Sequence, residues 1–337
     1  MRLVVGSRAV SVERVAVWTV IPVAGVLAAA TLLVGGHTLV DNFARLGIDM
    51  LFVFALLALW QNGFRFLRWL MFARRIGVPM KAGEGLLFYF AGCGMTLTPG
   101  RIGEMLRLWL IEKRFGTPYR RSTALFVADR VGDADTYLVL LGIAFVLRPV
   151  APGLAWSVLG GVIVANLCLL FPQPALGALG LAYGVTRRGR KLLVWLRRLV
   201  RHSASLLRPG VFLPGLGLGV VGWGAVPVVL VMALGRMGVE LGLGHAMMIC
   251  AVASMTGGST MLPGGGGSTE AVMVLLLRAA DVPLDTAVAA TVATRLAFLW
   301  LPVGIGLVVL PIALRAVRRR EQASITRLGA PLPEEMA

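Results

Sequence analysis

Charged residues interrupt the apolar segments of this chain at a few places, and these are the places where chemistry is expected. Glu104 has an arginine three residues before it and another three residues after it, which puts the three side chains on neighbouring turns of a helix. Ionisable residues within apolar segments are rare and typically serve binding or proton transfer. Seven residues of this kind are candidates for substrate binding: Arg101, Glu104, Arg107, Arg130, Asp133, Glu270 and Arg295.

The arginines among these candidates favour an anionic ligand, because the planar fork of a guanidinium group matches the oxygens of a phosphate group. We expect Arg101, Arg130 and Arg295 to contact such a group. Glu104 and Glu270 would then orient these arginines, or bind an amine or a proton.

A structural interpretation of the same residues is equally open. In it, Arg130 pairs with Asp133 or Glu104, and Arg295 pairs with Glu270. Such pairs would neutralise buried charge and hold distant parts of the chain together. A single pair can serve both purposes.

The composition identifies the setting of these residues as a membrane. The chain has 337 residues and a formal net charge of +17, yet 15% of its residues are charged and 58% are hydrophobic. Its mean hydropathy is +0.83. A soluble domain carries about 25% charged residues. These values exclude a disordered chain, a coiled coil and an ordinary soluble enzyme, and they argue against a nucleic-acid partner. They are typical of a polytopic membrane protein with roughly six to eight spans.

Metal and cofactor chemistry is not indicated by the residue pattern. Cysteine and histidine occur singly and far apart, at Cys93, Cys168, Cys250, His37, His202 and His245. Asp133-Ala-Asp135 resembles a DxD metal motif, but no nucleotide-diphosphate motif accompanies it, and no GxxxxGK[ST] nucleotide loop occurs. We therefore assign no metal site, cofactor or catalytic residue.

Two apolar stretches are too short to cross a membrane as single helices. The sequence predicts six full spans, at about 15–35, 47–67, 122–147, 153–171, 211–235 and 286–312. Between them, 82–112 is broken at Pro99-Gly100, and 243–280 is broken at Pro263-Gly264-Gly265 within a longer glycine run. Each half falls short of the about 20 residues that a helical span needs. We expect re-entrant helical hairpins, in which a cavity surrounds the broken backbone.

The distribution of Lys and Arg predicts the orientation. In this layout the basic loops share one side of the membrane, and few basic residues occupy the other. Because basic loops stay in the cytoplasm, both termini are expected there, in a multi-pass protein of the cytoplasmic membrane. The basic residues placed on that side are Arg65, Arg68, Arg74, Arg75 and Lys81, then Lys113, Arg114, Arg120 and Arg121, then eight in 187–208, and finally Arg315, Arg318, Arg319, Arg320 and Arg327.

The hairpins belong to an internal repeat with an offset of 164–166 residues. The pattern predicts two units, at about 78–150 and 239–312. An odd number of spans separates the two hairpins, so the second unit would be inverted, as in transporters that bind substrate between broken helices. The matching residues are Pro99-Gly100 with Pro263-Gly264, Glu104 with Glu270, Pro118 with Pro283, and Arg130 with Arg295.

The remaining segments are expected to be peripheral. The segment 187–201 has an apolar face opposite its arginines and predicts a helix on the anionic membrane surface. Residues 1–317 would form a single transmembrane domain, and 318–337 a disordered cytoplasmic tail.

Three motifs resemble a known family. They are Thr98-Pro99-Gly100-Arg101-Ile102-Gly103-Glu104, then Asp129-Arg130-Val131-Gly132-Asp133, and then Pro263 to Glu270. Together they resemble the lysylphosphatidylglycerol synthase transmembrane-region family, over about residues 10–315. Asp129 departs from the Glu usual at this position in the family, and the glycine run at 264–267 is longer than usual.

The resemblance implies a flippase-like membrane protein whose partners are lipids, either phospholipids or polyprenyl- or isoprenoid-type lipids. Some members of the family carry a soluble aminoacyl-transferase domain, and we expect none here. We therefore expect a non-enzymatic flippase for a lipid with an anionic or aminoacylated headgroup. The alternatives are a lipid-modifying membrane enzyme and a membrane partner of a separate glycosyl- or aminoacyl-transferase. A homodimer is also compatible with this interpretation.

Overall fold

A computed structural model of the chain describes residues 2–5, 8–11, 36–98, 104–147, 153, 156–157, 159–164, 206, 208–260 and 262–327. The described chain is helical, as predicted, apart from an antiparallel pair of short strands, β1 (Arg2–Val5) and β2 (Arg8–Ser11), with Arg2 opposite Ser11. The predicted span at 15–35, most of the span at 153–171 and the surface helix at 187–201 lie outside the described residues.

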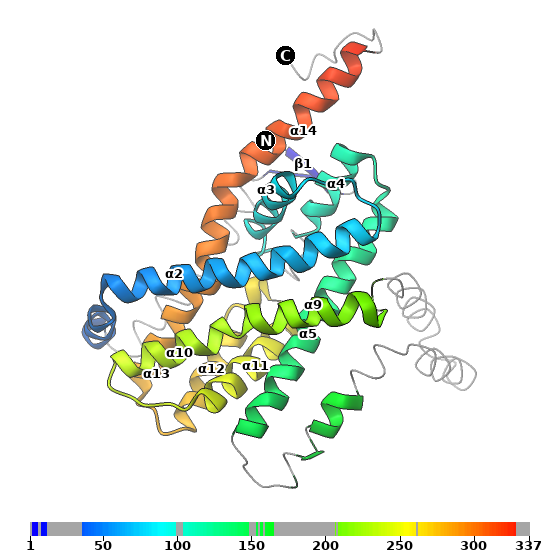
Figure 1. Cartoon of the computed structure of the whole chain (residues 1–337). Coiled ribbons are helices and arrows are strands. Elements are labelled where there is room, and N and C mark those ends of the chain that lie inside the picture. The colour runs from blue at the N-terminus through cyan, green and yellow to red at the C-terminus, as the bar shows by residue number, and fades with distance from the viewer. Residues whose placement is uncertain are drawn as a thin grey trace.

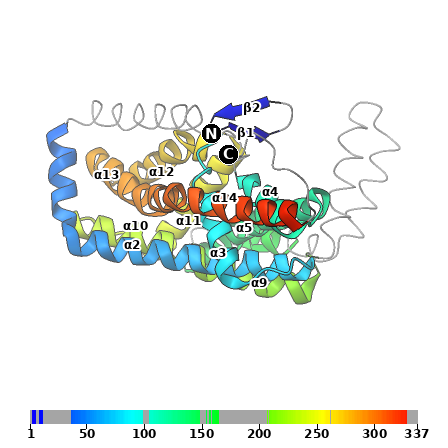
Figure 2. The ribbon, with the colours of Figure 1, turned by 90° about the horizontal axis from the view of Figure 1, so that it is seen from above.

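The first long helix is α2, which bends sharply near its start. Gly47 has a left-handed φ of 69°, a conformation that side chains with a Cβ rarely adopt, and the helix turns there (Figure 2). In chain order, the described helices and turns are α2 (Gly36–Arg75), α3 (Ala82–Cys93), α4 (Leu106–Phe115), α5 (Tyr119–Leu147), α9 (Pro209–Trp223), α10 (Ala225–Arg236), α11 (Leu243–Ser259), the short turn η2 (Pro263–Gly265), α12 (Ser268–Arg278), α13 (Leu284–Arg295), the π-helical turn η3 (Leu296–Trp300) and α14 (Leu301–Arg327).

Three helical segments of the described chain are long and apolar enough to cross a membrane: Ala44–Arg75, Pro209–Arg236 and Leu284–Arg318. They match the spans predicted at 47–67, 211–235 and 286–312. The 29-residue α5 covers the span predicted at 122–147, but its middle carries four charged residues. By contrast, α3, α4, α11 and α12 have 10 to 17 residues each, fewer than the about 20 that a span needs.

The helices pack around two apolar cores. The long arm of α2 lies alongside α9 and α10, and α5 crosses this layer (Figure 1). One core gathers side chains from the C-terminal half of α2 and from α3, α4, α5 and α14. The other gathers side chains from the start of α2 and from α10 to α13. Each pair of short helices therefore has a core of its own.

Two pairs of turns repeat along the chain with the same backbone geometry. Gly77 ends α2 with φ 79°, and Gly238 follows α10 with φ 83°. In both turns the next residue, a valine, donates its N–H to the carbonyl five residues back, at 3.0 and 2.9 Å. Gly116 after α4 and Asp281 after α12 have φ 68° and 62°, and each is followed two residues later by a proline.

The structure corrects one prediction. Arg65 and Arg68 do not lie at the cytoplasmic end of a span, because α2 continues to Arg75 and places both in its interior. Apolar neighbours at Leu67 and Trp69 to Phe72 extend the span past the two charges, which carboxylates of α5 neutralise. At the other end of the chain, α14 continues to Arg327, past the residue 318 at which the tail was expected to begin.

Candidate functional site

Two glutamates at the starts of short helices each meet an arginine of a long helix. Glu104 precedes α4 and Glu270 lies in the first turn of α12, where the helix dipole favours a negative charge. Arg130 of α5 donates from Nη2 to Glu104 Oε2 at 3.0 Å. Arg295, the last residue of α13, donates from Nε to Glu270 Oε1 at 2.6 Å. The two pairings expected from sequence are therefore both present.

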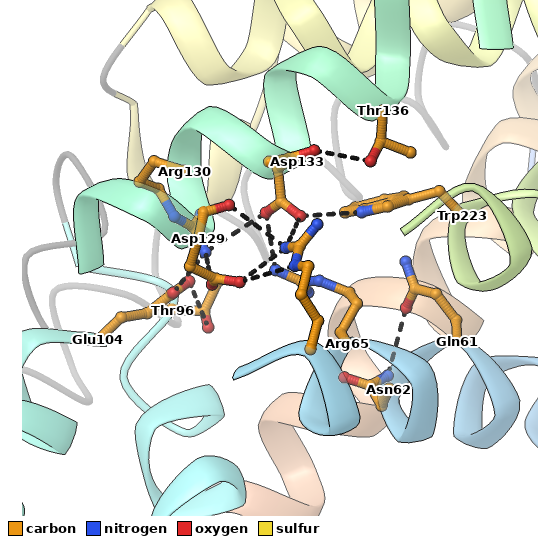
Figure 3. Close-up of polar contacts among 12 residues, drawn as sticks. Gln61, Asn62, Arg65, Thr96, Glu104, Asp129, Arg130, Asp133, Thr136 and Trp223 are labelled. Atoms are coloured by element: carbon orange, nitrogen blue, oxygen red, sulfur yellow. Dashed lines mark hydrogen bonds and ion pairs between the residues drawn. The ribbon is translucent and has the colours of Figure 1, made fainter. Parts of the chain in front are cut away.

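The first pair belongs to a larger buried network of charged side chains (Figure 3). Arg130 also contacts Asp129 at 3.0 Å and Asp133 at 3.4 Å. Arg68, whose side chain is fully buried, donates to Asp129 Oδ1 at 2.7 Å and to Asp133. Arg65 donates to the other oxygen of Asp133 at 2.9 Å. Three arginines thus face three carboxylates, those of Asp129, Asp133 and Glu104, so their charges balance without a ligand and tie α2 to α5.

Trp223, Gly132 of α5 and Gly219 of α9 also pack against this network. The indole Nε1 of Trp223 donates to Asp133 Oδ1 at 3.0 Å, and the guanidinium of Arg65 lies 5.0 Å from the centre of the indole ring. Gly132 and Gly219 lie against the guanidinium of Arg68, where a Cβ at either position would be 3.1 to 3.2 Å from its Nη1. These small residues make room for the buried charge.

Arg107 occupies its own buried position beside Glu104. Its Nε donates to the carbonyl of Tyr89 at 3.1 Å, and its guanidinium lies 4.2 Å from the centre of the Tyr89 ring. The distance from Nη1 to Glu104 is 3.8 Å. A Cβ on Gly92 would collide with the side chain of Arg107, so a glycine at this position leaves the space that the arginine side chain occupies.

The second pair is linked to the broken backbone of the α11–α12 hairpin. Arg295 donates from Nη2 to the carbonyl of Gly264 at 2.8 Å. Gly264 has φ 59°, and a Cβ there would lie 2.9 Å from the side chain of Leu97. The π-helical turn after Arg295 widens the helix just before Pro302, where an ordinary turn would bring the proline ring against the carbonyl four residues earlier.

Two cavities adjoin these groups. One of about 70 Å³ is lined from both halves of the chain, by Arg65 and Arg107 with Glu104, and by Thr269 with Arg295. The other, of about 320 Å³, lies between α5 and α11 and is lined by Arg130, Asp133 and the glycines 257 and 258. Tyr137 and Ser254 line both, so the cavities are neighbours. An anion in the first would face guanidinium groups from three helices.

The structure brings most of the predicted site residues together. Glu104, Arg107, Arg130 and Asp133 share one cluster, while Glu270 and Arg295 form the second pair across the smaller cavity. The predicted break at Pro263, Gly264 and Gly265 is a short turn between α11 and α12. The other break, at Pro99 and Gly100, and the candidate Arg101 lie outside the described residues.

Sequence reasoning missed Arg65, Arg68 and Trp223. A span predicted at 47–67 places the first two at its cytoplasmic end, where basic residues are common. Their spacing of three within a continuing apolar run was the available signal, since it puts both on one face of a longer helix. Trp223 gave no signal, because an indole in an apolar segment looks like an ordinary core residue.

Comparison with known proteins agrees with the motifs. A comparison with curated proteins finds no match. A family model described as the lysylphosphatidylglycerol synthase transmembrane region matches residues 14–306, which include both arginine–glutamate pairs. The chain is therefore a membrane protein that belongs to the lysylphosphatidylglycerol synthase transmembrane-region family.

Proposed function

We propose that the chain is a lipid flippase, which moves a lipid with an anionic or aminoacylated headgroup across the cytoplasmic membrane. The observation that carries the proposal is the smaller cavity, where guanidinium groups of Arg65, Arg107 and Arg295 meet among apolar helices. Guanidinium groups bind phosphate oxygens through paired hydrogen bonds. The family membership points in the same direction, because it connects the chain with membrane lipids.

We further propose that residues 78–150 and 239–312 form an inverted repeat of two units with re-entrant hairpins, and that both termini are cytoplasmic. The recurring backbone supports this proposal. The left-handed residues Gly116 and Asp281 are 165 positions apart, as are Arg130 and Arg295. Two arginine–glutamate pairs with the same placement would be improbable in unrelated helices.

The size of the cavities supports a headgroup that enters while its tails stay in the bilayer. About 70 Å³ suits a group the size of a phosphate rather than a whole lipid. The larger cavity beside it, with Arg130 at its wall, provides room for the rest of a headgroup. Movement of the lipid would therefore require the helices around Tyr137 and Ser254 to separate.

The experiment that tests this function measures transport and chemistry on the same preparation. Purified protein is placed in liposomes with fluorescent phosphatidylglycerol, and lipid exchange between the leaflets is followed together with lipid products by mass spectrometry. The proposal predicts exchange without a new product. Product formation with an added donor would instead identify a lipid-modifying enzyme. Neither exchange nor product would favour a membrane partner of a separate transferase.

A further inference from the structure

The two arginine–glutamate pairs occupy matching places but have different surroundings. Arg130 contacts Glu104 and also Asp129 and Asp133. At the same offset of 165 residues, Asp129 and Asp133 correspond to Thr294 and Phe298. The carboxylates that surround Arg130 therefore have uncharged counterparts beside Arg295.

The arginines of the first network have uncharged counterparts as well. The turns after α2 and α10 align Gly77 with Gly238, an offset of 161 residues. The same offset relates Arg65 and Arg68 to two valines of α10, at 226 and 229. Two aspartates and two arginines are thus replaced together by uncharged residues, a replacement that changes no net charge. Arg130 and Glu104 belong to a multiple ionic network, while the pair of Arg295 and Glu270 is simpler in that it has uncharged residues at the matching positions.

The simpler pair has the more accessible carboxylate and holds the hairpin break. Side-chain exposure is 20% for Glu270 against 4% for Glu104, while the arginines are 15% exposed at Arg295 and 25% at Arg130. One guanidinium group binds both the Glu270 carboxylate and the Gly264 carbonyl, at 2.6 and 2.8 Å. The second carboxylate oxygen of Glu270 is buried without a hydrogen-bond partner. Arg295 thereby fastens the end of α13 to the start of α12 and to the turn before it.

We infer that the Arg295–Glu270 pair is a latch that a phosphate-bearing headgroup opens, which rests on the proposed lipid transport. Arg295 lines the smaller cavity, so a phosphate there competes directly with the Glu270 carboxylate. Phosphate and carboxylate oxygens accept hydrogen bonds from the same N–H groups of a guanidinium. When Arg295 turns to the phosphate, the Gly264 carbonyl loses the hydrogen bond from this arginine. The turn at 263–267 is then no longer fastened to α13 and can move. The network around Arg130 stays closed and acts as the fixed partner against which the second hairpin moves.

Hydrogen–deuterium exchange of the hairpin tests the latch without any transport. The full chain in detergent micelles is titrated with phosphatidylglycerol, with diacylglycerol of the same acyl chains, or with inorganic phosphate. Phosphatidylglycerol is expected to speed exchange several-fold in peptides that cover 257–270 and to leave peptides of α5 unchanged. Diacylglycerol, which lacks the phosphate, is expected to have no effect. An effect of inorganic phosphate with none of phosphatidylglycerol would overturn the lipid as the source of the anion.

Variants separate the latch from general stability. Arg295→Lys keeps the charge but cannot bind Glu270 and Gly264 as a fork, so its hairpin should exchange rapidly before lipid is added and respond no further. Glu270→Gln weakens the competing partner, so less phosphatidylglycerol should be needed for half of the effect. The control Arg236→Lys alters an exposed pair with Asp49, at 2.7 Å, and should behave as wild type.

The possible failures are distinguishable. A hairpin whose exchange ignores phosphatidylglycerol in the wild type overturns the latch, even if lipid transport is observed. Phosphatidylglycerol-dependent exchange in a protein that does not move lipid overturns the transport function and leaves the latch as a binding response. If Arg295→Lys does not fold, the shift in lipid concentration with Glu270→Gln still decides the matter.

Discussion

Replacing Arg68 by methionine should destabilise the protein strongly. The side chain is fully buried and binds the carboxylates of Asp129 and Asp133, so its loss leaves negative charge uncompensated in an apolar setting. Breaking a buried ion pair from one side costs about 3–5 kcal/mol. With a shift of roughly 2–4 °C per kcal/mol, the midpoint of thermal unfolding should fall by roughly 6–20 °C.

The assay heats purified protein in one detergent to a series of temperatures. The folded protein that remains soluble at each temperature is measured by size-exclusion chromatography. The double variant Arg68→Met/Asp129→Asn removes one charge of each sign and should recover part of the loss. The control Arg236→Met breaks the exposed pair with Asp49 and should shift the midpoint by at most about 4 °C, since exposed pairs contribute about 0–1 kcal/mol. An Arg68→Met variant as stable as this control would refute the buried network.

Two further substitutions test the packing around the site. Gly306→Ala should lower the unfolding midpoint, because its Cβ would collide with backbone atoms of Gly94 and overpacking costs about 1–3 kcal/mol, whereas Gly304→Ala in the same helix meets no atom within 4 Å. Equal midpoints for these two variants would contradict the close approach of α3 and α14. Trp223→Phe keeps an aromatic ring but removes the donor to Asp133, and should cost about 1.5–3 kcal/mol in the same assay. No change would mean that this hydrogen bond is not formed in the protein.

Much of the fold could be predicted because it follows from the lengths of the apolar segments and from the positions at which proline and glycine interrupt them. The breaks at Pro263 and at the glycines that follow it separate short helices by local chemistry alone. The pair of Glu270 with Arg295 could be expected because buried charges need a partner of opposite sign, and for Arg130 the same reasoning left Glu104 and Asp133 both open.

The rest depended on tertiary contacts that a sequence pattern does not contain. Arg65 and Arg68 look like the end of a span, and only the aspartates of α5 explain why the helix continues past them. Arg107 was expected at the site, but its stacking on Tyr89 depends on the path left by Gly92.

The central claim is that arginines of the smaller cavity carry a lipid headgroup across the membrane. The most direct measurement is dithionite bleaching of fluorescent phosphatidylglycerol in liposomes that contain wild type, Arg295→Ala or Arg236→Ala, with protein-free liposomes as reference. Wild type and Arg236→Ala should expose lipid of both leaflets to bleaching, while Arg295→Ala should match the protein-free liposomes, in which only the outer leaflet bleaches. Equal bleaching by Arg295→Ala and wild type, or none beyond the outer leaflet with wild type, would contradict the account.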